Sequence, residues 1–253
     1  TAVQVQEGKL KIFGGTFDLA ETIKMHAPNY SKYLINCIDS AYESGETQVA
    51  IIGGTYVGFD PTKSPEKGEP SYVPNGVEIE TSSDGYAVIA NTTPGNDSVA
   101  VVNRVYYNKL EDAISAALKG DTVTLVDNVA EDINVEESKV ITLDLAGYRV
   151  TASTESIIKG NIIINDSSKG LGKYVGTAPI SVEGGKLTLN GGNIKIEDNA
   201  NGYGIYCSDG GVVEVNGGTI QSTYAPLTGN NTTGDMNFTV NGGELTAQYG
   251  PAI

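Results

Sequence analysis

Short runs in which apolar and polar residues alternate recur along the second half of the chain, and each repeat contains a pair of glycines. The triplet Asn-Gly-Gly occupies residues 190–192, 216–218 and 241–243, with spacings of 26 and 25 residues. An alternating four-residue run precedes each triplet, another follows it, and a tyrosine marks a third position in each repeat. Alternation with a period of two is typical of a β-strand that buries one face. The pattern therefore predicts about three short strands per repeat, joined by tight turns.

Strands of four residues are not stable alone, so we expect the repeats to stack as parallel strands that bury one row of side chains and pair their backbones. Glycine suits the sharp turns because it reaches positive φ without penalty, and asparagine tolerates the left-handed region nearly as well. Three strands in about 25 residues fit a parallel β-helix better than a propeller, whose blades need about 40 residues. A leucine-rich repeat is disfavoured because its LxxLxLxxN spacing is missing. The sequence therefore predicts an all-β solenoid.

The first third of the chain contains the same pattern. Residues 6–17 align with residues 183–194, and residues 48–56 form a further copy. The copies flank an insertion, residues 18–47, in which apolar residues recur at helical spacing. This spacing predicts a short amphipathic helix over residues 31–44, ended by the glycine that follows.

Turn-forming residues divide the region that follows. Prolines at positions 61, 65, 70 and 74 disrupt regular structure, which predicts a surface loop over residues 60–76. Residues 77–80 and 86–89 flank Asp84-Gly85, a pair typical of a β-hairpin turn. Residues 91–98 are rich in Asn, Thr, Pro and Gly and are the centre of a predicted linker.

A second short amphipathic helix is predicted over residues 109–119, where apolar residues again recur at helical spacing. Asn108 is the predicted N-cap, and Gly120 ends the helix. A helix before the first repeat is expected to cover the open end of the stack, where unpaired backbone groups invite aggregation.

The domain organisation follows from these elements. We predict that residues 1–90 are the C-terminal part of a first β-helix module, that residues 91–105 are a linker, and that residues 106–253 are a second module. The alternating pattern runs up to both ends of the sequence without a cap. We therefore expect a fragment of a longer chain, or ends that partner chains cover, as in a trimeric fibre.

Charge and composition narrow the classes of partner. The 253 residues include 16 Lys+Arg and 31 Asp+Glu, for a formal net charge of −15. A phosphate backbone needs a basic face, so this charge argues against nucleic acid, and no apolar run approaches the ~20 residues of a membrane helix. Cys37 and Cys207 form neither a disulfide framework nor a metal motif and are interpreted as buried hydrophobes. We predict no cofactor and no metal ion.

Several stretches resemble a known group of proteins. Residues 106–114 (YYNKLEDAI), 120–126 (GDTVTLV) and 141–148 (ITLDLAGY) are similar to the opening of right-handed parallel β-helix, pectate-lyase-like modules. Residues 53–61 (GGTYVGFDP) and the predicted hairpin are similar to the segment that closes such modules. These modules occur in large surface proteins of gut Firmicutes and in their phages. The resemblance implies a right-handed parallel β-helix in two tandem segments, located on a bacterial cell surface or on a virion.

Candidate catalytic residues are few. A pectate-lyase-like site needs clustered carboxylates for Ca²⁺ and a basic residue, and the chain has two arginines, Arg104 and Arg149. Hydrolysis of a glycosidic bond needs two carboxylates a few ångströms apart, and Asp144 with Glu183 or Glu214 is the candidate pair. We interpret these acids as surface solubility residues.

Two further motifs carry no predicted chemistry. His26, the single histidine, lies beside a proline in a predicted loop with no acid or nucleophile tied to it by a motif. Residues 198–202 are similar to part of a calcium loop but lack the glutamate that closes such a loop. We predict no catalytic residue and no enzymatic activity.

Tyr203, Tyr224 and Tyr249 occupy similar places in successive repeats and are the candidate ligand-binding residues. An outward row of tyrosines offers flat apolar faces for sugar rings, whereas an inward row is a packing ladder. The candidate ligand is a surface glycan.

Two functions are consistent with the sequence. The first is a non-catalytic extracellular structural or adhesive β-solenoid, a segment of a bacterial surface protein or of a phage virion appendage such as a fibre, spike or decoration. Its partners would be a surface glycan, neighbouring copies of itself or virion proteins. The alternative is a carbohydrate-active enzyme, a polysaccharide lyase or depolymerase.

Overall fold

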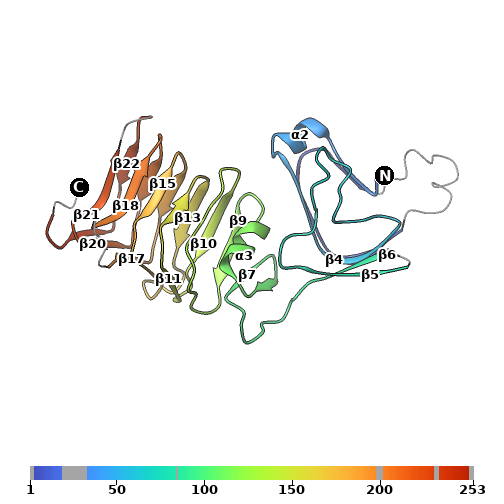
Figure 1. Cartoon of the computed structure of the whole chain (residues 1–253), viewed down its shortest axis with the longest axis horizontal. Coiled ribbons are helices and arrows are strands. Elements are labelled where there is room, and N and C mark those ends of the chain that lie inside the picture. The colour runs from blue at the N-terminus through green and yellow to red at the C-terminus, as the bar shows by residue number, and fades with distance from the viewer. Residues whose placement is uncertain (1–2, 19–32, 84, 198–201, 231–233, 251–253) are drawn as a thin grey trace. The chain divides into compact units, whose positions relative to one another are not determined.

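A computed structural model of the chain describes residues 3–18, 33–83, 85–197, 202–230 and 234–250 (Figure 1). About half of the described residues lie in β-strands, which pair extensively in parallel, and two short helices are present among them. The chain divides into two compact units, Thr1–Thr93 and Pro94–Ile253.

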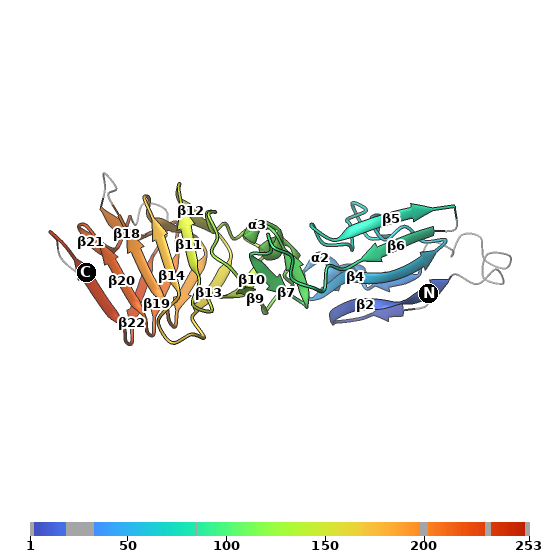
Figure 2. The same ribbon diagram turned by 90° about the horizontal axis from the view of Figure 1, so that it is seen from below.

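The described residues of the second unit form three sheets, named here I, II and III (Figures 1 and 2). Sheet I has eight strands, in the spatial order β22 (Asn237–Val240), β19 (Val212–Val215), β16 (Lys186–Leu189), β13 (Asn161–Asn165), β10 (Val140–Asp144), β9 (Asp121–Leu125), β7 (Ala100–Val102) and β8 (Val105–Tyr107). Sheet II has five, in the order β11 (Arg149–Ala152), β14 (Lys173–Gly176), β17 (Asn193–Ile196), β20 (Thr219–Ser222) and β23 (Glu244–Ala247). Sheet III has four, in the order β12 (Ser156–Ile158), β15 (Ile180–Glu183), β18 (Tyr203–Ser208) and β21 (Ala225–Asn230).

The chain passes through the three sheets in a fixed rotation. From β10 onward it runs through sheet I, then II, then III, and returns to sheet I one strand further along. Before β10, single parallel bridges join Val129 to sheet II and Val135 to sheet III. Each strand from β10 to β23 is parallel to its partners, which belong to the preceding and following repeats. The structure thus confirms a mostly β fold with stacked parallel repeats.

The register of the strands follows the sequence period, because Leu187 pairs with Ile162 on one side and with Val213 on the other. Alternate residues are buried, so each sheet has one apolar inner face. The inner faces of sheets II and III meet where the hydroxyl groups of Tyr174 and Ser156 lie 2.8 Å apart in a hydrogen bond. Burial of this continuous apolar surface is the main source of stability for such short strands.

The asparagines of the Asn-Gly-Gly triplets form a hydrogen-bonded ladder beside sheet I. The side-chain amide of Asn190 donates to Asn165 (3.0 Å), Asn216 donates to Asn190 (3.0 Å), and Asn241 donates to Asn216 (2.8 Å). None of these asparagines has positive φ, so their predicted role in left-handed turns was wrong. Their side chains join one repeat to the next instead.

The second glycine of each triplet supplies the turn. Gly218 has a φ of +79°, and a Cβ at this position would lie 2.4 Å from the carbonyl oxygen of Gly192. Glycine is therefore required both for the backbone conformation and for the close approach of successive turns.

A β-hairpin and a helix precede the first repeat of the second unit. Strands β7 and β8 are antiparallel, and β7 pairs antiparallel with β9. Helix α3 (Leu110–Ala116) packs on both hairpin strands. The strands β7 and the start of β8 lie inside the predicted linker 91–105, so the irregular part of that stretch ends before Ala100.

Helix α3 differs in two ways from the predicted helix 109–119. The carboxylate of Glu131, and not Asn108, accepts the first free N–H groups of the helix, those of Leu110 and Glu111, both at 3.0 Å. The helix also ends early, because Ala117 is extended and the Lys139 ammonium donates to the carbonyl oxygen of Ala117 at 2.9 Å. A distant residue thus fixes each end of this helix, which local sequence signals do not show.

The described residues of the first unit form two sheets. One pairs β1 (Val3–Val5) with β3 (Ile35–Cys37), and the other has the order β2 (Gly8–Asp18), β4 (Thr47–Val57), β6 (Gly85–Ile89) and β5 (Glu78–Ser82). Strands β2 and β4 are parallel, whereas β4, β6 and β5 are antiparallel, which confirms the predicted hairpin. The predicted loop 60–76 contains neither helix nor strand.

Residues 31 and 32 lie outside the described residues, and over residues 33–38 the predicted helix 31–44 was wrong. Residues 35–37 form β3, and the helix α2 is limited to Asp39–Glu43. Ile35 and Cys37 are buried while β3 pairs in parallel with β1, so pairing with a distant strand overrides the helical spacing of apolar residues.

Candidate functional site

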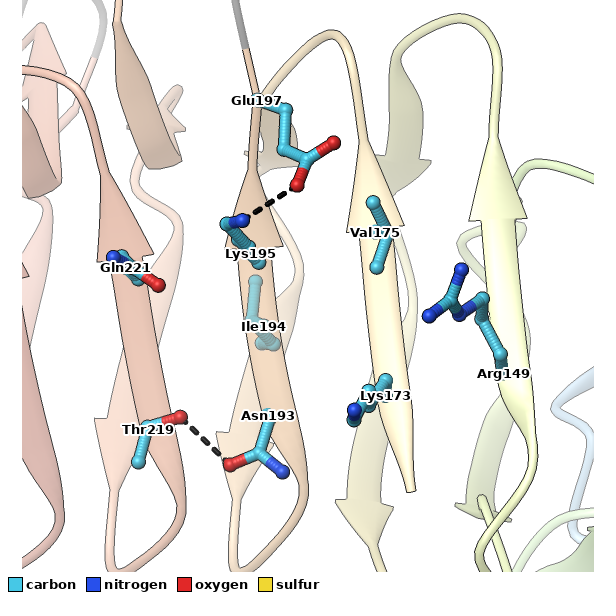
Figure 3. A pocket seen from close by; sticks show the side chains of 9 residues that line it. All are labelled: Arg149, Lys173, Val175, Asn193, Ile194, Lys195, Glu197, Thr219 and Gln221. Carbon is cyan, nitrogen blue, oxygen red and sulfur yellow. Dashed lines mark hydrogen bonds and ion pairs between the residues drawn. The ribbon is translucent and has the colours of Figure 1, made fainter. Parts of the chain in front are cut away.

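The outer face of sheet II carries a groove of about 430 Å³ (Figure 3). Residues at the start of successive strands lie directly opposite one another: Arg149 of β11 faces Lys173 of β14, which faces Asn193 of β17. Lys195 lies one outward position further along β17, beside Gln221 of β20. We call this surface the basic groove, which is lined by Arg149, Lys173, Val175, Asn193, Ile194, Lys195, Glu197, Thr219 and Gln221.

Two of the three cations in the basic groove lack an ion-pair partner in the part of the chain that the structure describes. Among the described residues, neither Arg149 nor Lys173 has a carboxylate within 4.0 Å. Lys195 forms an ion pair with Glu197 at 2.6 Å, and the hydrogen bond and charge of Lys195, with a smaller contribution from Arg149, lower the pKa of Glu197. Glu197 therefore stays ionised and compensates Lys195, which leaves Arg149 and Lys173 as the excess positive charge.

The neutral side chains of the groove are held by hydrogen bonds. Thr219 donates its hydroxyl to the Asn193 side-chain oxygen at 2.8 Å, and the Asn193 amide donates to the carbonyl oxygen of Gly170 at 2.8 Å. Ile194 lies beneath the groove and is buried. The basic groove therefore combines fixed polar groups with a rigid apolar base.

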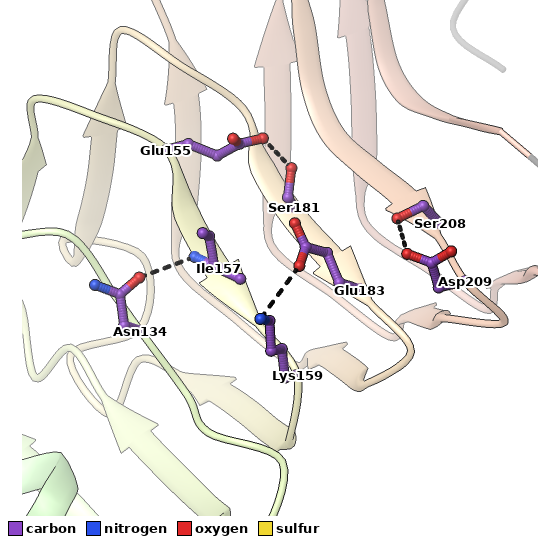
Figure 4. A network of polar contacts seen from close by, with 8 residues as sticks. All are labelled: Asn134, Glu155, Ile157, Lys159, Ser181, Glu183, Ser208 and Asp209. Atoms are coloured by element: carbon purple, nitrogen blue, oxygen red, sulfur yellow. Dashed lines mark hydrogen bonds and ion pairs between the residues drawn. The ribbon is translucent and has the colours of Figure 1, made fainter.

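The outer face of sheet III has acidic residues whose oxygens are mostly engaged within the chain (Figure 4). The Ser181 hydroxyl donates to Glu155, and the Lys159 ammonium lies 3.8 Å from Glu183. Ser208 donates its hydroxyl to Asp209 at 3.3 Å. These contacts join neighbouring strands or close a turn, so the surface of sheet III is a network of internal pairs.

The candidate carboxylates for glycoside hydrolysis are not brought together. Asp144 lies at the end of β10 in sheet I, where it accepts the N–H groups of Ala146 (3.0 Å) and Ser167 (2.9 Å). Glu214 lies in the same sheet three strands away, a separation of about 14 Å at the usual strand spacing. Glu183 lies in sheet III. Paired catalytic carboxylates are usually within about 10 Å, so Asp144 and Glu214 do not form such a pair.

Glu214 is also held in the wrong protonation state for a general acid. Lys186, at 2.8 Å, and Asn216, at 3.1 Å, donate to the Glu214 carboxylate and lower its pKa. A catalytic acid needs a raised pKa, which burial or a neighbouring carboxylate supplies.

The remaining candidates are dispersed. Arg104 lies in the turn between β7 and β8 with a φ of +67°. His26 and residues 198–201 lie outside the described residues. The groups of acids, histidines and cysteines in the described ranges contain no set that could hold a metal ion.

The three candidate tyrosines do not form one row. Tyr203 pairs with Ala225, so the position opposite Tyr224 is Gly202, and the Tyr203 ring stacks on Tyr206 with centroids 6.3 Å apart. Tyr224 and Tyr249 do form an exposed pair, with ring centroids 6.4 Å apart. A shift of one residue in register therefore separates Tyr203 from the other two.

The basic groove was missed by the sequence analysis, which considered Arg149 only as a base. The sequence does contain an indication of the groove, because Arg149, Lys173 and Lys195 occupy polar positions of alternating runs. Recognising the groove required the strand register, which places these residues side by side.

No protein-family model, curated protein or solved structure matches the chain. Among the described residues, neither α2, with 5 residues, nor α3, with 7, has the length needed to span a lipid bilayer.

Proposed function

We propose that the chain is a non-catalytic structural or adhesive module that acts outside the cell, in a bacterial surface protein or a phage virion appendage. The second unit is, in this proposal, a right-handed parallel β-helix. The fixed rotation through sheets I, II and III and the parallel register between repeats support this fold. The resemblance to pectate-lyase-like modules of surface proteins supports its location.

The observation that carries the proposal is the use of polar side chains to join successive repeats. The asparagine ladder joins four repeats, and the ion pairs Lys159–Glu183 and Lys186–Glu214 each join adjacent strands. Such contacts add to the backbone pairing between repeats and stiffen the stack, as a stalk or fibre requires.

The first unit fits the same proposal as the end of a preceding module. Its parallel strands β2 and β4 approach closely at glycines, since a Cβ on Gly53 would lie 2.5 Å from the carbonyl oxygen of Phe13. The antiparallel hairpin of β5 and β6 then covers the free edge of β4. Covering an edge in this way ends parallel stacking.

The experiment that tests the proposal is incubation of the purified chain with host and plant polysaccharides. We expect no increase in reducing ends and no absorbance of unsaturated uronates, since the candidate acids are separated or paired. Turnover that is lost in Asp144→Asn, Arg149→Gln or Glu214→Gln would overturn the proposal in favour of a polysaccharide lyase or depolymerase.

A further inference from the structure

The basic groove of sheet II is unusual for this chain. The chain carries a net charge of −15, yet Arg149 and Lys173 lie directly opposite each other on adjacent strands with no carboxylate within 4.0 Å among the described residues. Like charges in directly opposed positions of a sheet destabilise it. The arrangement therefore lowers the stability of the free protein, and an anion bound between the two side chains would remove that penalty.

We propose that the basic groove binds a linear acidic glycan, with a carboxylate or sulfate group placed between Arg149 and Lys173. The guanidinium of Arg149 can donate two parallel hydrogen bonds to such a group, and the Lys173 ammonium adds a point charge. The inference rests on the proposed function, whose adhesive form needs a ligand.

The neutral part of the groove suits the sugar itself. Asn193, Thr219 and Gln221 continue the polar surface across β17 and β20, which extends the groove over four strands and about 14 Å. Their amide and hydroxyl groups are both donors and acceptors, as sugar hydroxyls require. The hydrogen bonds that hold Asn193 and Thr219 reduce the entropy lost on binding.

Charge density distinguishes a glycan from nucleic acid. With Glu197 paired to Lys195, the described residues of the groove have an excess of two cations, which neutralise one or two isolated anionic groups. Nucleic acid instead needs an extended basic face, and its bases stack on aromatic rings. The described residues that line the basic groove include no aromatic side chain. A glycan with spaced acidic groups is therefore the better electrostatic match.

Binding of the intact chain to three probes tests the proposal: polygalacturonate, which is carboxylated, heparin, which is sulfated, and dextran, which is neutral. We expect binding to at least one acidic probe, weakening as salt rises from about 0.01 M to 1 M, because salt screens exposed charges. Polygalacturonate binding alone assigns a carboxylated ligand, and heparin binding alone assigns a sulfated one. Dextran bound as tightly as the acidic probes, or no binding to any probe, would overturn the proposal.

Variants locate the site. Arg149→Glu places a carboxylate opposite Lys173, so we expect an unchanged or higher melting temperature together with a loss of affinity of at least about tenfold. Lys173→Gln should weaken binding about threefold to tenfold. The matched control is Lys186→Gln, which removes a lysine of sheet I paired with Glu214 and should change affinity less than about twofold. Full affinity in Arg149→Glu would show that the groove is not the site.

Two further measurements separate this inference from other readings. Light scattering shows whether Arg149→Glu instead disrupts association between copies of the chain, in which case the groove is a self-contact and the proposal fails. A reducing-end assay on the same samples measures catalysis independently. If the chain neither binds nor cleaves the probes, the glycan site is overturned and the proposed function is not. If the chain cleaves a probe, the proposed non-catalytic function is overturned. Binding of single-stranded DNA, with the same sensitivity to Arg149→Glu and no glycan binding, would also overturn the proposal.

Discussion

Sheets II and III of the second unit are built from the same repeats, yet the charged residues on their outer faces are paired to different extents. On sheet II, Arg149 and Lys173 face each other without a carboxylate partner among the described residues. On sheet III, Glu155 is bonded to Ser181, and Glu183 lies beside Lys159. Both sheets consist of parallel strands, so the side chains on their outer faces determine whether a face is closed on itself or open to a ligand.

The turns beside the two sheets differ as well. Gly218 precedes sheet II strand β20 and is packed against the preceding turn, whereas Gly210 follows sheet III strand β18 and has open space where a Cβ would lie. Both glycines have a φ of +79°. The position of Gly218 is therefore closed by the preceding turn, whereas the position of Gly210 leaves room for a side chain.

The largest expected difference in stability is between substitutions on the inner and on the outer face of sheet II. Ile194→Asp should lower the free energy of unfolding by about 4 kcal/mol or more, because it buries an unpaired charge among the side chains beneath the groove. Its neighbour Lys195 is exposed, and Lys195→Gln should change stability by less than about 0.5 kcal/mol. Urea denaturation measures both, and equal effects would contradict the assigned inner and outer faces.

The next comparison isolates the tight turn. Gly218→Ala should destabilise by about 3 kcal/mol, since a side chain there meets both a positive φ and the carbonyl oxygen of Gly192. Gly210→Ala meets only the positive φ and should cost about 1 kcal/mol. Thermal denaturation of the two variants gives the difference. A larger loss in Gly210→Ala would mean that close stacking is not what requires glycine at 218.

A smaller effect concerns the contact between the inner faces of sheets II and III. Tyr174→Phe removes the hydrogen bond to the Ser156 hydroxyl and should cost about 1 kcal/mol, because Ser156 keeps its bond from the N–H of Ile133 at 2.8 Å. Urea denaturation at neutral pH is the measurement. No loss in Tyr174→Phe would show that the hydroxyl contact does not stabilise the meeting of the two sheets.

The same variant changes the dependence of stability on pH. Burial raises the pKa of Tyr174 to about 12, despite the opposing hydrogen bond from Ser156. The pKa of Tyr174 in the folded protein is above the unfolded value near 10. The neutral Tyr174 side chain therefore contributes to the free energy of unfolding in full below pH 10, and this contribution is lost as pH rises through about 12. Above pH 10 the free energy of unfolding should therefore fall less steeply in Tyr174→Phe than in the native chain. Parallel slopes would contradict the raised pKa.

The smallest expected effects test whether outer charges are paired. Lys159→Gln removes a partner of Glu183 and should destabilise by less than about 0.5 kcal/mol, as exposed ion pairs do. Lys173→Gln removes a cation opposed to Arg149 and should stabilise by a similar small amount. The opposite signs, measured by urea denaturation at low salt, are the expected result, and a stability loss in both variants would contradict the comparison.

The sequence predicted the repeats well because their information is local. Alternation and the Asn-Gly-Gly spacing are sufficient to place most strands of sheets I and II, and Gly85 marked the hairpin of the first unit. The remaining elements depend on partners that are distant in sequence, which the sequence does not show. Residues 35–37 have helical spacing of apolar residues but pair with β1, and α3 is capped by Glu131 from 20 residues away.

The candidate site depended on register in the same way. The repeat spacing suggested that Tyr203 and Tyr224 are equivalent, but the strands pair Tyr203 with Ala225. Arg149 and Lys173 are 24 residues apart in sequence, and nothing local shows that they face each other. Which side chains share a surface is determined by a pairing shift of a single residue, which periodicity of 25 or 26 residues does not resolve.

The asparagine ladder also determines how the protein ages chemically. An asparagine followed by glycine is prone to deamidation, in which the next backbone nitrogen attacks the side-chain amide and ammonia is lost. In the ladder, the N–H of Gly217 is bonded to the carbonyl oxygen of Leu189 at 3.2 Å, and that of Gly242 to Val215 at 3.3 Å. These bonds restrain the attacking nitrogens beside Asn216 and Asn241.

Asn190 lacks this protection, since the structure shows no such bond for the N–H of Gly191 within the described residues. Conversion of Asn190 to aspartate would replace its amide donor by a carboxylate oxygen facing the Asn165 side-chain oxygen. Within the ladder, deamidation in a stored sample should therefore begin at residue 190 and weaken the junction between the repeats of β13 and β16 before the other two junctions.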